Sequence, residues 1–139
     1  MNLAKYIDHT ILKSDVTSQQ IVQLCKEAQE NNFYAVCVNS SYVALCFHEL
    51  KSSPVKIASV VGFPLGVCDT ATKAFETALA VKNGATEIDM VIHVGALKEK
   101  KYDYVQNDIA EVVEAAAGNK VKVILETALL TNEEKVIAC

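Results

Sequence analysis

Short runs rich in valine and isoleucine alternate with longer amphipathic stretches five times along the chain. The runs cover residues 6–12, 34–38, 56–62, 87–94 and 121–126. Each is bounded by turn or helix-capping residues, as is typical of β-strands. Strands that are mostly apolar, joined by helices with one apolar side, indicate βαβ units and a parallel sheet. The sequence therefore predicts an α/β fold.

Two architectures satisfy this pattern, an open doubly wound sheet and a closed (β/α)8 barrel. Five strands in 139 residues suit a doubly wound sheet, whereas a complete barrel needs roughly 250 residues. The last segment argues for an interrupted fold. Thr131 and Glu134 form a capping box that predicts a fifth helix, and the chain stops about two turns later, at Cys139. We therefore expect a larger domain than these residues alone provide.

Helix positions follow from caps and from apolar residues spaced three and four apart. Thr17 and Gln20 form a capping box that predicts the start of the first helix. The third helix is expected to begin near Asp69 or Thr70 and to end at Asn83-Gly84. The predicted core-facing residues of the first four helices are, in order, Ile21, Leu24, Cys25 and Ala28; Val43, Cys46, Phe47 and Leu50; Ala71, Ala74, Phe75 and Ala78; and Val105, Ile109, Val112 and Ala116.

Composition excludes several classes of function. The net charge is −4 and all basic side chains are scattered lysines, with no arginine, which argues against nucleic-acid binding. No apolar run approaches the ~18 residues of a membrane span, and the start of the chain lacks a signal-peptide pattern, so we expect no membrane association and a cytoplasmic location. The five cysteines include no C-x-x-C pair and are interpreted as reduced thiols rather than disulfides or zinc ligands.

Polar residues inside apolar strands are the candidates for chemistry. Asp89 lies in the middle of the fourth run, where a lone buried carboxylate is costly. It is therefore either paired with hydroxyls or a lysine, or it transfers protons. Asp8 and Thr10 raise the same question in the first run, where the alternative to a functional role for Asp8 is a hydrogen bond to backbone donors near the strand end. His93 is expected on the same face of the fourth strand as Asp89, so it can pair with that carboxylate.

The remaining reactive residue types carry weaker signals. Cys37 ends the second run, and its default interpretation is an inert buried thiol. The sequence has no G-x-G-x-x-G, Walker or G-x-S-x-G motif. We interpret every lysine as a surface residue, including Lys73 in the third helix. Lys122 lies near the start of the fifth run, which in a barrel is the end remote from the site.

Five segments stand in order along the chain: YIDHTILK at 6–13, AVCVN at 35–39, VVGFPLG at 60–66, EIDMVI at 87–92 with GAL at 95–97, and LET at 125–127. In order and spacing they resemble the deoxyribose-phosphate aldolase family. The resemblance implies a (β/α)8 TIM barrel, of which residues 1–139 are the N-terminal part with about five of the eight βα units, truncated in the fifth helix. It also implies a small phosphorylated sugar substrate, cleaved through a lysine Schiff base without metal or organic cofactor. By the same resemblance Asp89 is the proton-relay residue, Asp8 and Thr10 line the site, and Cys37 lies in the pocket.

The sequence departs from the family pattern in two places. His93 stands where asparagine is more common. The K-T-S-T-G segment that holds the Schiff-base lysine, together with a second lysine and a glycine-rich phosphate site, does not occur in these 139 residues. We therefore expect little aldolase activity from this chain alone, and we expect two copies to associate so that exposed sheet edges are covered. The alternatives are a non-catalytic remnant that binds a phosphorylated ligand or partner chain, and a compact doubly wound domain.

Overall fold

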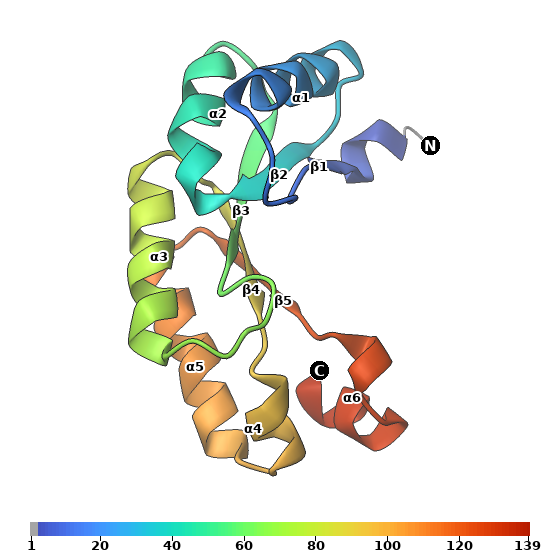
Figure 1. Cartoon of the computed structure of the whole chain (residues 1–139), viewed down its shortest axis with the longest axis vertical. Coiled ribbons are helices and arrows are strands. Elements are labelled where there is room, and N and C mark those ends of the chain that lie inside the picture. The colour runs from blue at the N-terminus through green and yellow to red at the C-terminus, as the bar shows by residue number, and fades with distance from the viewer. Residues whose placement is uncertain (1–2) are drawn as a thin grey trace.

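A computed structural model describes residues 3–139, and it contains one parallel sheet of five strands (Figure 1). The strands follow one another in space as they do in sequence, from β1 to β5. They are β1 (Asp8–Thr10), β2 (Ala35–Asn39), β3 (Lys56–Val61), β4 (Glu87–Val91) and β5 (Lys120–Ile124). The predicted α/β class and number of strands are confirmed.

The helices also lie where their caps place them. The main ones are α1 (Ser18–Glu30), α2 (Val43–Glu49), α3 (Thr70–Lys82), α5 (Tyr102–Ala115) and α6 (Asn132–Ala138), with 3-10 turns η1 (Leu3–Tyr6), η2 (Ser40–Tyr42) and η3 (Thr127–Leu129). Both predicted capping boxes form, at Thr17–Gln20 and at Thr131–Glu134. One helix was not predicted, α4 (Val94–Lys98). The fourth strand was expected to reach residue 94 but ends at Val91, because His93 caps this helix.

The main core lies between one face of the sheet and the helices. Alternate strand residues, among them Val36, Val38, Ile57 and Ile88, pack against apolar residues of α1, α2, α3 and α5. Figure 1 shows these helices in a curved row along one side of the strands. Consecutive strand order with helices along one side is the arrangement of a (β/α)8 barrel, since a doubly wound sheet has helices on both faces. The barrel-type fold is therefore confirmed, and the doubly wound alternative is wrong.

Helix α3 faces the sheet with a different side from the predicted one. Its buried residues are Lys73, Thr77 and Ala80, whereas the predicted core residue Phe75 is 71% exposed. The prediction for this helix face was wrong, as was the interpretation of Lys73 as a surface residue. The reason is an internal partner: the Lys73 ammonium lies 2.5 Å from Asp108 of α5 and donates to the Val91 carbonyl at 3.0 Å.

Among residues 3–139, no helix has the length and apolar character needed to cross a membrane.

Candidate functional site

Three charged side chains meet on the inner face of the sheet, the face without helices. Asp8 of β1, Asp89 of β4 and Lys122 of β5 all project from this face, because side chains alternate along each strand. The Lys122 ammonium lies 2.6 Å from Asp8 Oδ2 and 3.2 Å from Asp89 Oδ1. One lysine therefore bridges two carboxylates that are 81 positions apart in sequence, at residues 8 and 89.

Lys122 is the residue of this cluster that the sequence analysis missed. Its side chain is 45% exposed, so the prediction of a surface lysine was partly right. The prediction that it lies far from the candidate site residues was wrong. The strand pattern contained a usable signal. Lys120 and Lys122 alternate with Val121 and Val123 in β5, which places both lysines on one face of the strand.

The protonation states within the cluster follow from burial and pairing. Burial raises the pKa of Asp89, and repulsion from Asp8 and Glu87 adds to this effect, while Lys122 opposes it. Burial tends to lower the pKa of Lys122, but the hydrogen bond to Asp8 and the charge of Asp89 outweigh it and raise that pKa above its usual value. Lys122 is therefore a persistent ammonium, and Asp89 is a carboxylate that gains a proton more readily than an exposed aspartate.

One oxygen of Asp89 lacks a well-directed hydrogen bond. Its Oδ1 is buried and lies near the Lys122 ammonium, but outside hydrogen-bonding direction, and accepts no hydrogen bond from the residues that the structure describes. The other oxygen, Oδ2, faces the Cys37 thiol at 3.8 Å. A buried acceptor without a well-directed donor costs free energy, and the Lys122 ammonium 3.2 Å away offsets part of this cost.

Cys37 and Thr10 contribute differently to this face. Burial, together with the negative charge of Asp89, raises the pKa of Cys37 to about 12. The thiol is thus neutral at physiological pH and is a wall of the site rather than a nucleophile. The Thr10 hydroxyl donates to the Asp8 carbonyl at 2.7 Å and is exposed. It lies beside the cluster without contacting Asp89.

A second charged layer lies next to the first, toward the amino ends of the strands. Tyr34 donates a short hydrogen bond to Glu87, and the Lys120 ammonium lies 2.8 Å from the Tyr34 hydroxyl and 3.4 Å from Glu87. Glu87 is buried, and its charge is balanced by these contacts. This layer is fully paired, and it supports the β4–β5 pairing on which the position of Asp89 depends.

His93 does not join the cluster. Its Nδ1 accepts a hydrogen bond from the Ala96 backbone at 3.1 Å, and its ring lies edge-on to Tyr104 at 5.5 Å between centroids. The pairing of His93 with Asp89 that strand alternation suggested is therefore wrong, because the chain has already left the strand at Val91.

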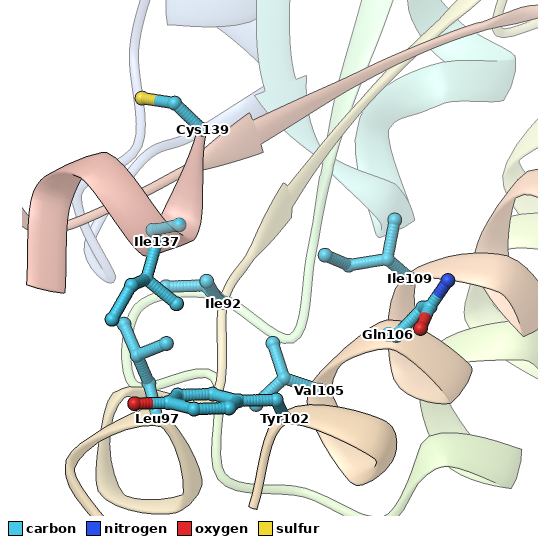
Figure 2. Close-up of a pocket in the computed structure, with 9 residues that line it drawn as sticks. Ile92, Leu97, Tyr102, Val105, Gln106, Ile109, Ile137 and Cys139 are labelled. Atoms are coloured by element: carbon cyan, nitrogen blue, oxygen red, sulfur yellow. The ribbon is translucent and has the colours of Figure 1, made fainter. Parts of the chain in front are cut away.

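Two cavities lie near the carboxyl ends of the strands. One, of about 530 Å³, is formed by the segments that follow β1, β2 and β3, and its lining includes Leu12, Lys13, Asn39 and Phe63. Leu12 also packs against Cys37, so this cavity adjoins the inner face. The other, of about 380 Å³, lies between α4, α5 and α6 (Figure 2). Most of its lining is apolar, and it has no charged side chain.

Within residues 3–139, no group of three or more histidine, cysteine or acidic side chains is arranged to hold a metal ion. The five cysteines are free thiols.

Comparison with known proteins adds independent information. Residues 2–137 match the family described as DeoC/LacD family aldolase. The whole chain is 58% identical to a deoxyribose-phosphate aldolase of Bdellovibrio bacteriovorus and 59% identical to one of Clostridium novyi, and in each case it covers 63% of the relative. The chain thus spans just under two thirds of the length of these curated relatives.

A solved structure shows the same arrangement. The tetrameric deoxyribose-phosphate aldolase of Aeropyrum pernix superposes with a TM-score of 0.85 at 30% identity, over 97% of this chain and 57% of that one. The agreement extends over all five strands described above, since nearly the whole chain is superposed.

Proposed function

The chain belongs to the DeoC/LacD aldolase family, and we propose that it supplies the proton-transfer side of a deoxyribose-phosphate aldolase site. The reaction is the cleavage of 2-deoxy-D-ribose 5-phosphate to glyceraldehyde 3-phosphate and acetaldehyde through a lysine Schiff base. The observation that carries the proposal is the contact of Lys122 with both Asp8 and Asp89 on the inner face of the sheet.

Asp89 is assigned proton transfer. Its pKa is raised by burial, which brings a carboxyl group closer to the pH at which it both accepts and donates protons. Its Oδ1 lies 3.2 Å from the Lys122 ammonium and accepts no hydrogen bond from the described residues, and we assign to this oxygen the proton of a substrate hydroxyl. Asp8 and Lys122 hold this carboxylate in place, Cys37 forms a neutral wall, and Thr10 lies at the rim.

The two lysines with internal contacts are poor candidates for the nucleophile. Schiff-base formation needs an unprotonated amine. The raised pKa of Lys122 keeps it protonated, and Lys73 is fully buried against Asp108. By resemblance to the family, we assign the Schiff base to a lysine in a segment of the K-T-S-T-G kind, which does not occur in these 139 residues. The proposal requires no metal or organic cofactor and places the reaction in the cytoplasm.

Borohydride trapping tests the assignment of the nucleophile. The chain is incubated with deoxyribose 5-phosphate and sodium borohydride, and intact mass spectrometry detects a reduced adduct. We expect no adduct on this chain, and adduct formation on the full-length Clostridium novyi relative treated in parallel. A substrate adduct on Lys122, or on any other lysine of this chain, contradicts the assignment.

Complementation tests the role of Asp89. The chain is mixed with the C-terminal segment of a relative that carries the K-T-S-T-G strand, and cleavage of deoxyribose 5-phosphate is followed by aldehyde release. If activity is restored, Asp89→Asn should lower it about a hundredfold or more, the usual range for loss of a proton-transfer group. Asp103→Asn, the same change at an exposed acid of α5, is the matched control and should retain most of the activity. Equal losses in the two variants would contradict the special role of Asp89.

A further inference from the structure

Glu76 belongs to α3, in the row of helices outside the sheet (Figure 1). Its Oε1 accepts a hydrogen bond from the Ser40 hydroxyl at 2.7 Å, and its Oε2 accepts one from the Gly62 backbone amide at 2.9 Å. Ser40 directly follows β2, and Gly62 directly follows β3. A single carboxylate therefore ties together the segments in which the chain leaves two neighbouring strands.

The two segments joined by Glu76 form part of the wall of the cavity of about 530 Å³. The lining includes both residues next to Ser40 and the two residues after Gly62, namely Asn39, Ser41, Phe63 and Pro64. Glu76 itself lies outside this lining. Any effect of Glu76 on the cavity therefore passes through the residues beside its two hydrogen-bond donors.

The turn at residues 62–66 is closely packed at both ends. A Cβ atom at Gly62 would lie 3.0 Å from Cε of Lys73, so this end rests on the Lys73 side chain. The Gly66 amide donates to the Gly62 carbonyl at 2.8 Å, and a Cβ atom at Gly66 would lie 2.4 Å from the Ile92 carbonyl oxygen. The hydrogen bond from the Gly62 amide to α3 therefore fixes a turn that is closed on itself and packed against the chain beyond β4.

The cavity lies beside the group assigned to proton transfer. Leu12 lines the cavity and also packs against Cys37, whose thiol lies 3.8 Å from Oδ2 of Asp89. The cavity is also at the carboxyl ends of the strands, which is the catalytic end of a (β/α)8 barrel. The shape of its wall therefore affects how a bound molecule is presented to Asp89.

We propose that Glu76 is a positioning residue for substrate binding. By joining the segments after β2 and β3, it holds the cavity wall in the shape that accepts the carbon chain of the sugar phosphate. The inference rests on the proposed function, because that function supplies the substrate. A carboxylate suits the role, since each of its two oxygens is an acceptor and both partners are donors.

Reach and accepting groups matter here more than charge. Glutamine keeps the length of the side chain, its carbonyl oxygen can accept from the Gly62 amide, and its amide group can donate to the Ser40 hydroxyl, which also accepts. Aspartate keeps the charge but is one methylene shorter, so it cannot reach both partners. Alanine removes both hydrogen bonds. These three replacements at Glu76 therefore separate reach from charge.

Amide hydrogen exchange on the intact chain, measured by NMR, tests the tie independently of catalysis. We expect Glu76→Ala and Glu76→Asp to speed exchange at the Gly62 amide about tenfold, and Glu76→Gln to restore most of the protection. Glu111→Ala, at an exposed glutamate of α5, is the control and should leave this exchange unchanged. The proposal is overturned if the Gly62 amide exchanges at the parent rate in Glu76→Ala.

Steady-state kinetics on the chain complemented with the C-terminal segment of a relative tests the link to substrate. Glu76→Ala and Glu76→Asp should raise KM for deoxyribose 5-phosphate about tenfold and leave kcat within about threefold, and Glu76→Gln should recover most of the affinity. A purely structural role would reduce the amount of folded chain, which lowers the apparent kcat and leaves KM unchanged. An unchanged KM in Glu76→Ala, or a Glu76→Gln variant as impaired as Glu76→Ala, overturns the proposal.

Failure of the proposed function gives a different result. A parent complex that releases no aldehyde counts against that function, and with it against substrate binding in this cavity. In an active complex, by contrast, an unchanged KM in Glu76→Ala overturns only the role of Glu76.

Discussion

Replacement of Lys73 by methionine tests whether the buried ion pair behind β4 stabilises the fold. The Lys73 ammonium contacts Asp108 Oδ2 at 2.5 Å and the Val91 carbonyl at 3.0 Å, and Thr70 donates to Asp108 Oδ1 at 2.8 Å. Both charged side chains are 0% exposed. Methionine keeps much of the apolar stem but removes the positive charge, which leaves the carboxylate in the interior with a single hydroxyl partner.

The magnitude follows from what is left unpaired. Removing one partner of a buried ion pair costs about 3–5 kcal/mol, because the remaining charge stays buried without compensation. The Val91 carbonyl also loses a hydrogen bond, although this cost overlaps with the first. We expect Lys73→Met to lower the free energy of unfolding by about 4 kcal/mol. In Lys73→Met/Asp108→Asn the residual side chain is neutral, so the loss should shrink to roughly 1–2 kcal/mol.

Urea unfolding followed by far-UV circular dichroism measures these differences. Small domains are stable by only about 5–15 kcal/mol, so the single variant should unfold at a much lower urea concentration. Lys82→Met, at an exposed position of the same helix, is the control and should change stability by less than about 0.5 kcal/mol. The reasoning is refuted if Lys73→Met costs less than about 1 kcal/mol, or if the double variant is as unstable as the single one.

Three further predictions concern the inner face and its surroundings. The raised pKa of Asp89 means that its charge opposes folding at neutral pH, and this penalty shrinks as pH falls through the folded-state pKa. Asp89→Asn should therefore be about 1 kcal/mol more stable than the parent protein at pH 7, and the two should be equally stable below an aspartate's usual pKa of ~3.9. Urea titrations at each pH measure this difference. Gly66→Ala should cost more than about 2 kcal/mol by the same assay, because the glycine has φ +69° and a Cβ there would lie 2.4 Å from the Ile92 carbonyl; a neutral effect would show that this turn shifts freely. Iodoacetamide at neutral pH should alkylate the exposed Cys139 long before Cys37, whose pKa is raised to about 12, and peptide mass spectrometry showing rapid modification of Cys37 would contradict its burial and neutral state.

Features set by residues close together in sequence were predicted well. The caps at Thr17–Gln20 and Thr131–Glu134 each consist of hydrogen bonds between residues three apart, so the sequence alone contains both partners. The five strands were located for the same reason, since short runs of β-branched residues between turn signals specify a strand locally. Their ends were less certain: β4 stops early because a histidine beyond it caps an unpredicted short helix.

The candidate site was predicted in part. Strand alternation identified Asp89 and Asp8 as polar residues that need a partner, and the structure places both against one lysine. Their roles in catalysis, and those of Thr10 and Cys37, stay predictions. The contact of Lys122 with this site was not predicted, because its partner Asp8 lies 114 positions away in sequence. The strand register that brings them together is a property of the assembled sheet.

The sequence by itself determined the kinds of element, their order and the family. Only the tertiary structure decided which side of α3 faces the sheet and which charges meet. Apolar spacing alone favours burial of Phe75, but Lys73 and Asp108, 35 positions apart, form an ion pair that satisfies both buried charges and holds the polar side inward. The physical reason is that helix periodicity is encoded locally, whereas the cost of burying a charge depends on a partner that only the folded chain brings into contact.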